Sequence, residues 1–206
     1  MYKFTKDIID NALSHNEFMD FTKDILENEN RIKPYDSEAY YNYTNVNFKR
    51  SEKILRNFKI DNKLYNALND GIKHWTWILL NEPWCGDGSF SQAVLYAFSL
   101  ASGGNIDFKV LLRDSHIEIM EDFLTNGGMA IPKLICLDKG LNVLGTWGPR
   151  PKKLQIEFNE WKKDENFDTN TKIKKVNRWY LKDKNQGIQK DFINLIKEWK
   201  KIQYAR

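Results

Sequence analysis

The segment that most constrains the fold of this chain is the junction around Cys85. Residues 75–80 (WTWILL) are aromatic, β-branched or aliphatic, which is typical of a short buried strand. After the cysteine, apolar side chains at positions 90, 94, 97 and 98 have helical spacing. Cys85 is therefore expected where a strand passes into the N-terminus of a helix. Unpaired backbone N–H groups and the helix dipole favour an anion there, so we expect the thiol pKa to fall toward the reactive range of ~3.5–7.5.

The residues after this junction alternate between strand and helix patterns. A strand is predicted at 106–112, a helix at about 117–124 and a hairpin formed by strands 133–137 and 143–147. A further helix is expected to begin after Pro149 and Pro151 and to continue through Trp161. A strand-helix-strand unit of this length requires a parallel pair with a right-handed crossover. The order therefore predicts an α/β fold with a mixed sheet.

Three short motifs resemble a known family. Residues 82–87 (EPWCGD), residues 126–128 (NGG) ahead of Ile131-Pro132-Lys133, and residues 147–151 (WGPRP) are together similar to a group of bacterial thioredoxin-like proteins. The resemblance covers roughly residues 74–198. It implies a thioredoxin-like fold, with a central mixed β-sheet flanked by helices.

The resemblance also implies roles for individual residues. Cys85 takes the position of the catalytic nucleophile, and the peptide bond before Pro132 takes that of the cis-proline loop, whose backbone binds a substrate strand. Trp84 would form an apolar wall beside the thiol, and Gly86 would let another backbone approach closely. The candidate substrate-binding residues are Trp84, Gly86, Asp87, Ile131 and Pro132. No metal site or bound cofactor is expected.

The sequence departs from the thioredoxin pattern at three positions. The second cysteine of Cys-x-x-Cys would fall at position 88, which is glycine, and the buried acid six positions before the nucleophile corresponds to Leu79. Asp87 places a carboxylate near the thiol, which opposes ionisation of the thiol. A mixed disulfide on Cys85 would therefore need an external thiol to resolve it, such as a low-molecular-weight thiol acting as co-substrate.

Two functional hypotheses follow. In the first, the protein is a monothiol thiol-disulfide oxidoreductase in which Cys85 attacks a protein or small-molecule disulfide. In the second, it is a non-catalytic thioredoxin-fold protein whose groove around Trp84 and Ile131 binds a peptide. Cys136 lies within an apolar strand, where a free cysteine behaves as a small hydrophobe, so we expect it to be structural.

The flanking segments are predicted to be helical and to pack on the core. Residues 1–71 form an N-terminal helical extension, residues 72–165 the thioredoxin-like domain and residues 166–206 a basic C-terminal tail. Within the extension, a capping box at 14–17, Ser37 and Asp61 indicate helix starts. His15 and His74 have no ligand companions and are expected at the surface or at caps. In the tail, the apolar pattern weakens from Thr171 until Gly187, where a final amphipathic helix begins.

Composition limits the compartment and the partners. Two cysteines and 41% hydrophobic residues indicate a folded protein without a disulfide scaffold, and we expect a reducing cytoplasm. No apolar stretch approaches ~20 residues, and the first residues do not resemble a signal peptide, so no membrane partner is expected. Residues 172–206 hold eleven Lys or Arg against three acidic residues. We interpret this excess as a solvated helix face rather than a nucleic-acid site. The sequence does not indicate an oligomeric state.

Overall fold

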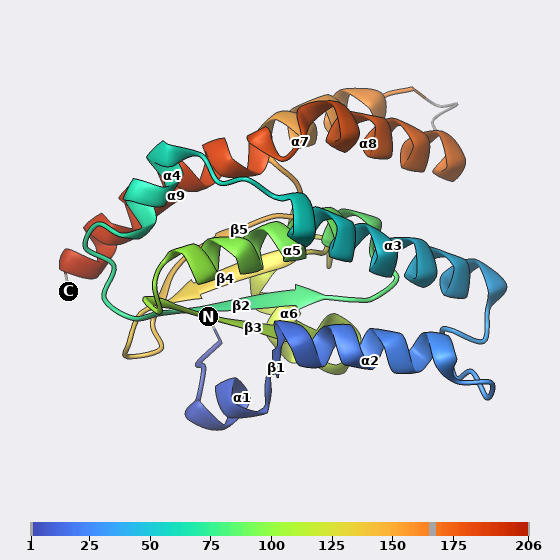
Figure 1. Ribbon diagram of the computed structural model, residues 1–206, viewed down its shortest axis with the longest axis horizontal. Coiled ribbons are helices and arrows are strands. Elements are labelled where there is room, and N and C mark those ends of the chain that lie inside the picture. The colour runs from blue at the N-terminus through green and yellow to red at the C-terminus, as the bar shows by residue number, and fades with distance from the viewer. Residues whose placement is uncertain (1, 165–167, 206) are drawn as a thin grey trace.

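A five-stranded sheet forms the centre of the computed structural model, which describes residues 2–164 and 168–205 (Figure 1). The spatial order of the strands is β1-β3-β2-β4-β5. Their bounds are β1 Leu13–Ser14, β2 Trp75–Asn81, β3 Ile106–Leu112, β4 Lys133–Leu137 and β5 Val143–Trp147. The predicted parallel pair (β2 with β3) and the predicted hairpin (β4 with β5) are both confirmed. Since β4 runs antiparallel to β2, the sheet is mixed.

The helices cover both faces of this sheet. Their bounds are α1 Lys6–Asn11, α2 His15–Glu27, α3 Glu38–Asn57, α4 Asn62–Leu68, α5 Gly86–Ala101, α6 Ile117–Met120, α7 Lys152–Trp161, α8 Thr169–Asp183 and α9 Gln186–Tyr204. Two 3₁₀ turns, Arg113–Ser115 and Glu121–Phe123, flank α6. The predicted helix at about 117–124 is therefore shorter and less regular than expected.

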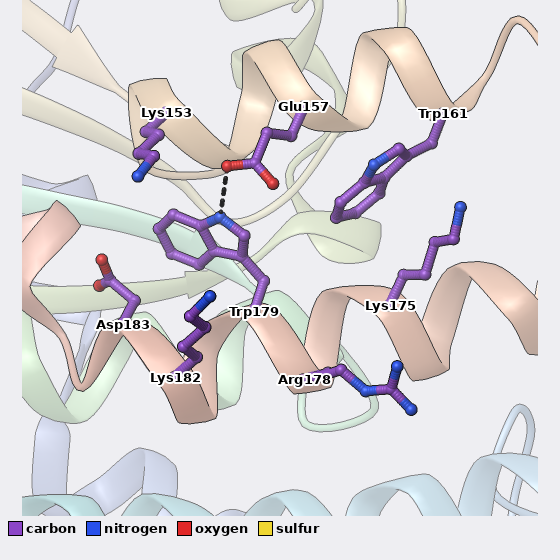
Figure 2. A pocket seen from close by; sticks show the side chains of 8 residues that line it. All are labelled: Lys153, Glu157, Trp161, Lys175, Arg178, Trp179, Lys182 and Asp183. Atoms are coloured by element: carbon purple, nitrogen blue, oxygen red, sulfur yellow. Dashed lines mark hydrogen bonds between the residues drawn. The ribbon is translucent and has the colours of Figure 1, made fainter.

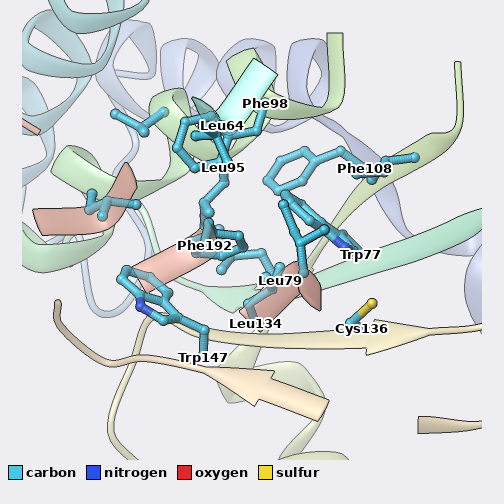
Figure 3. Packing of buried hydrophobic residues seen from close by; sticks show 14 of the residues in the cluster. Leu64, Trp77, Leu79, Leu95, Phe98, Phe108, Leu134, Cys136, Trp147 and Phe192 are labelled. Atoms are coloured by element: carbon cyan, nitrogen blue, oxygen red, sulfur yellow. The ribbon is translucent and has the colours of Figure 1, made fainter. Parts of the chain in front are cut away.

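Alternation along β2 divides the core into two clusters. Trp77 and Leu79 pack with α5 and α9, as Figure 3 shows around Phe192, whereas Ile78 and Leu80 pack on the other face with α1 and α6. Successive strand residues point to opposite faces, so a strand whose residues are mostly apolar can supply both clusters. This explains why residues 75–80 form one continuous apolar run.

Local capping signals locate the helix starts well. The capping box of α2 forms between Ser14 and Glu17, Ser37 is the N-cap of α3, and the Asp61 side chain caps α4. His15 differs from the expectation of a surface or capping position. Its ring is buried, stacks on Tyr96 with ring centroids 4.0 Å apart, and lies 3.1 Å from the Gln92 amide. Burial lowers the pKa of His15 to about 4, so the ring is neutral.

Both flanking segments join the body of the fold. β1, from the N-terminal segment, pairs antiparallel with β3 at the edge of the sheet, and α3 packs along α5. Near the other end of the chain, α9 lies beside α4 (Figure 1). α8 lies in the segment after Thr171 where the apolar pattern weakens. The pattern is weak because only Val176 and Tyr180 of this helix are buried.

Candidate functional site

Cys85 lies where the sequence places it, between β2 and α5. It is the N-cap residue of α5, with extended backbone (φ −75°, ψ 114°), and its sulfur accepts a hydrogen bond of 3.3 Å from the Gly88 N–H. The turn that leads into it is closed by a hydrogen bond from the Cys85 N–H to the Glu82 carbonyl. A thiol thus occupies the position at which Ser, Thr or Asp usually caps a helix.

The direction of the predicted pKa shift is wrong. Cys85 is only 6% exposed, and its pKa is raised to about 12, first by burial and second by the negative charge of Asp87. The Gly88 N–H, Arg150 and Arg113 act in the opposite direction but do not outweigh burial. Desolvation of a fully buried group shifts a pKa by up to 3–5 units, more than a single helix end supplies. The resting thiol is therefore protonated.

The loop of Ile131 and Pro132 lies against this thiol. The Cys85 thiol donates a hydrogen bond of 3.5 Å to the Ile131 carbonyl, and the peptide bond between Ile131 and Pro132 is cis. Pro132 itself is buried. Gly148, at φ 114°, packs so closely on this loop that a Cβ at that position would lie 2.2 Å from the Pro132 carbonyl oxygen. Glycine at 148 thus allows the motif at 147–151 to dock behind the loop.

The same motif delivers Arg150 to Asp87. The two side chains form a buried ion pair of 2.7 Å, and Asp87 also accepts a hydrogen bond of 3.0 Å from the Tyr180 hydroxyl of α8. Burial raises the pKa of Asp87, and Arg150 and Tyr180 act against this shift. The carboxylate beside the thiol is therefore balanced by a guanidinium, and the C-terminal segment contacts the site directly.

Packing excludes a side chain at position 88. A Cβ on Gly88 would lie 2.0 Å from the Oδ1 atom of Asn81, a buried residue at the end of β2. By contrast, a Cβ on Gly86 would meet nothing within 4 Å. The missing second cysteine is therefore not a simple replacement, because no residue larger than glycine fits beside Asn81 without rearrangement.

A cavity of about 630 Å³ opens in front of Cys85. This volume is within the range of small-molecule sites. Of the predicted site residues, Trp84, Cys85, Gly86, Asp87 and Ile131 line it, whereas Pro132 does not. The remaining lining residues, which the sequence did not reveal, are Tyr40, Tyr43, Val46, Asn47 and Arg50 of α3, Arg113, Met129, Ala130 and Arg150 of the loops, and Ile173 and Asn177 of α8.

A second hollow of about 500 Å³ lies between α7 and α8 (Figure 2). Trp161 and Trp179 point into it, and the Trp179 indole N–H donates a hydrogen bond of 2.9 Å to Glu157. It shares no lining residue with the cavity at Cys85, and its lining contains no cysteine. We therefore treat the Cys85 cavity as the candidate site.

Two further findings concern the described part of the chain. None of its His, Cys, Asp and Glu residues gather in groups of three or more that could hold a metal ion. Among its helices, none combines the length and the apolar character needed to cross a membrane.

A mixed sheet, with a cysteine capping the helix that follows a central strand and a cis-proline loop against that cysteine, defines a thioredoxin-fold protein. The model of a thioredoxin family matches residues 33–162, more than half of the sequence, and the chain belongs to this family. The match includes α3 as well as the motifs around Cys85. No curated protein matches the chain.

Solved structures share the fold. An HIV epitope-scaffold is 14% identical, with 97% of this chain and 97% of the scaffold covered and a TM-score of 0.54. A protein of unknown function from Pseudomonas aeruginosa is 16% identical, with 94% of this chain and 99% of that protein covered and a TM-score of 0.51. At these identities the likeness concerns the fold alone.

Proposed function

We propose that this protein is a monothiol thiol-disulfide oxidoreductase, with Cys85 as nucleophile and an external thiol as the resolving partner. The observation that carries the proposal is the position of the Cys85 sulfur. It lies on the wall of a ligand-sized cavity, between the Gly88 N–H and the Ile131 carbonyl. Trp84, Gly86 and Ile131 supply the surface against which a disulfide would lie.

The proposed reaction has two balanced steps. The Cys85 sulfur attacks one sulfur of a disulfide R–S–S–R, which forms Cys85–S–S–R and releases R–S⁻. This leaving thiolate takes up the proton lost by Cys85 and becomes R–SH. An external thiol R′–SH then attacks the mixed disulfide, which regenerates the Cys85 thiol and releases R–S–S–R′. The supply of R′–SH requires a thiol-rich compartment, which fits the cytoplasm that we expect.

The ionised fraction of the Cys85 thiol limits the rate of the first step. A pKa of about 12 leaves roughly one Cys85 thiol in 10⁵ ionised at pH 7. Exchange with a disulfide free in solution should therefore be slow. A disulfide held in the cavity gains from proximity, which can raise effective concentration by several orders of magnitude. The proposed enzyme thus depends on binding its substrate more than on an activated thiol.

The protonated thiol also favours a second candidate function. A thiol that donates a hydrogen bond to Ile131 helps to hold the loop in place, as expected of a non-catalytic protein that binds a peptide or small ligand in this groove. In that case Cys85 would be a structural part of the site.

Mixed-disulfide formation separates the two candidates. The protein would be incubated with a small disulfide at pH 8, and intact mass would be recorded before and after adding a thiol. The oxidoreductase proposal expects one adduct on Cys85, formed faster than on the same protein unfolded in denaturant after correction for thiolate fraction, and released by the thiol. Cys85→Ser should form no adduct and Cys136→Ser should behave as wild type. If the folded protein reacts no faster than the unfolded chain, the binding role is the better account.

A further inference from the structure

The charges around the Cys85 cavity are one-sided. Its charged lining residues are three arginines (Arg50, Arg113 and Arg150) and one acid, Asp87. Asp87 is already paired with Arg150 at 2.7 Å. The lining residues therefore carry an excess of two positive charges, of which one (Arg113) is paired with Asp114 outside the lining, whereas the chain as a whole carries a net charge of +4.

Arg50 is the least compensated of these cations. Its Nη1 atom donates to two neutral groups, Asn47 Oδ1 at 2.9 Å and Ser89 Oγ at 2.8 Å, and its guanidinium lies 4.4 Å from the centre of the Phe90 ring. Among the described residues, no carboxylate lies within ion-pair distance of it. Asp87 acts on Arg50 from beyond that distance and is already paired with Arg150. A largely buried guanidinium without an ion pair of its own is costly, and an anion entering the cavity would lower that cost.

Arg113 and Arg150 are the other two cations that line the cavity. Arg113 pairs with the half-exposed Asp114 at 2.5 Å, and its guanidinium lies 5.2 Å from the Trp84 ring. The Nε atom of Arg150 is buried and has no hydrogen-bond partner within the described chain. Guanidinium groups present forked donors that match carboxylates.

The rim of the cavity is apolar. Tyr40, Tyr43, Val46 and Met129 are among the lining residues and are between 36% and 53% exposed. A gathering of exposed apolar side chains around a cavity indicates a binding surface. The site thus combines an apolar entrance, a cationic interior and a thiol.

We infer that the substrates of this cavity are small disulfides and thiols that carry carboxylate groups, with Arg50 as a principal binding residue. This inference deepens the proposed function and rests on it for the reaction. The binding part of it, an anion beside Arg50, stands separately from the chemistry of Cys85.

Charge-matched reagents test the inference. Rates of mixed-disulfide formation would be measured for glutathione disulfide (anionic), hydroxyethyl disulfide (neutral) and cystamine (cationic), with wild type and Arg50→Gln. The substitution should slow the anionic reagent on the order of tenfold, the lower end of electrostatic steering effects, and change the neutral reagent less than about twofold. Arg56→Gln is the matched control, because Arg56 lies on the same helix, is exposed and does not line the cavity. High salt should reduce the preference for the anionic reagent.

Binding without chemistry separates the two proposals. Isothermal titration of S-methylglutathione into Cys85→Ser should show binding that Arg50→Gln weakens and Arg56→Gln does not. If no disulfide reacts but this binding is present, the oxidoreductase proposal fails and the anion site stands. If binding is absent, or if Arg50→Gln slows neutral and anionic reagents equally, the anion site is overturned. Circular dichroism of each variant checks that it is folded. Arg113→Gln, which removes another arginine of the cavity lining, is a second variant that should weaken binding of S-methylglutathione.

Discussion

The two cysteines of this protein show that burial alone does not tell a site from a core. Neither forms a disulfide, both are buried, and burial raises the pKa of both. Cys136 lies in the middle of β4, packed in the cluster that contains Trp77 (Figure 3). Cys85 caps a helix and lines a cavity.

The difference lies in what surrounds each sulfur. Near Cys85, the Gly88 N–H, Arg150 and Arg113 all lower the thiol pKa, and they are outweighed by burial and Asp87. These groups would stabilise a thiolate if a bound ligand or a shift of Asp87 changed the balance. Among the described groups that shift the pKa of the Cys136 thiol, none is a guanidinium. Strands β2 and β5 flank Cys136 on both sides. Reactivity should therefore belong to Cys85 alone.

The largest expected difference between the two thiols is in alkylation. Because the pKa of Cys85 is about 12, its reaction with iodoacetamide should rise about tenfold per pH unit, or roughly a thousandfold from pH 7 to 10, without a plateau. Cys136 should react only when the protein unfolds. Single-cysteine variants, Cys136→Ser and Cys85→Ser, allow each rate to be measured by mass spectrometry. A plateau for Cys85 near pH 7 would show that its thiolate is stabilised.

Restoring the thioredoxin cysteine tests why Cys85 stands alone. In Gly88→Cys the new Cβ overlaps the Oδ1 atom of Asn81, so unfolding should become easier by roughly 1–3 kcal/mol, the usual cost of overpacking. Gly86→Ala, which adds a Cβ in open space two residues earlier in the same helix, is the matched control and should cost little. Denaturant unfolding gives both values.

Coupling identifies the cause of that cost. Asn81→Ala should recover part of the stability lost in Gly88→Cys, so the two substitutions should not be additive. Equal stability of Gly88→Cys and Gly86→Ala would mean that the helix start adapts easily. Packing would then not explain the missing cysteine.

The sequence predicted the elements that depend on local signals. The strand that leads to Cys85, the hairpin of β4 and β5, and the helix starts at Ser37 and Asp61 follow from periodicity and capping, which involve near neighbours in the chain. The resemblance of the motifs to the family also predicted that the loop of Ile131 lies beside the Cys85 thiol. These features could be predicted because each depends on one segment of the chain or on the resemblance to the family.

The parts that could not be predicted are tertiary. Arg50 reaches the cavity from α3 and Tyr180 reaches Asp87 from α8, segments that the sequence could assign only to helical flanks. The predicted direction of the Cys85 pKa shift is wrong for the same reason, because the burial of the thiol depends on which segments pack over the start of α5. Tyr40 and Tyr43 form part of the cavity wall on α3, but their exposure is a result of the fold that the sequence alone does not reveal.

Removing the charge of Asp87 tests how electrostatics distinguishes the Cys85 thiol from the Cys136 thiol. Asp87→Asn removes the second cause that raises the pKa of Cys85 and leaves Arg150, which lowers it. Alkylation of Cys85 at pH 8 should therefore quicken about tenfold, one pKa unit, while Cys136 is unaffected. Asp191→Asn is the matched control, since burial also raises the pKa of Asp191 and its carboxylate also accepts a hydrogen bond from an aromatic residue, in this case the Trp147 indole N–H. Slower alkylation in Asp87→Asn would instead indicate that Asp87 helps to remove the thiol proton.

The last comparison concerns stability and reverses the ranking of the two cysteines. Serine at 136 would place a hydroxyl in an apolar strand, beside the buried indole N–H of Trp77. The serine oxygen can accept from that N–H, but its own O–H would lack a matched acceptor, and burying a hydroxyl with incomplete pairing costs about 1–3 kcal/mol. Serine at 85 would keep the helix cap and gain a stronger acceptor for the Gly88 N–H, so it should cost less than about 0.5 kcal/mol. Denaturant unfolding of both variants measures the difference. If Cys85→Ser proved the more destabilising, the thiol at the helix start would be a structural element first, and the binding role without catalysis would gain support.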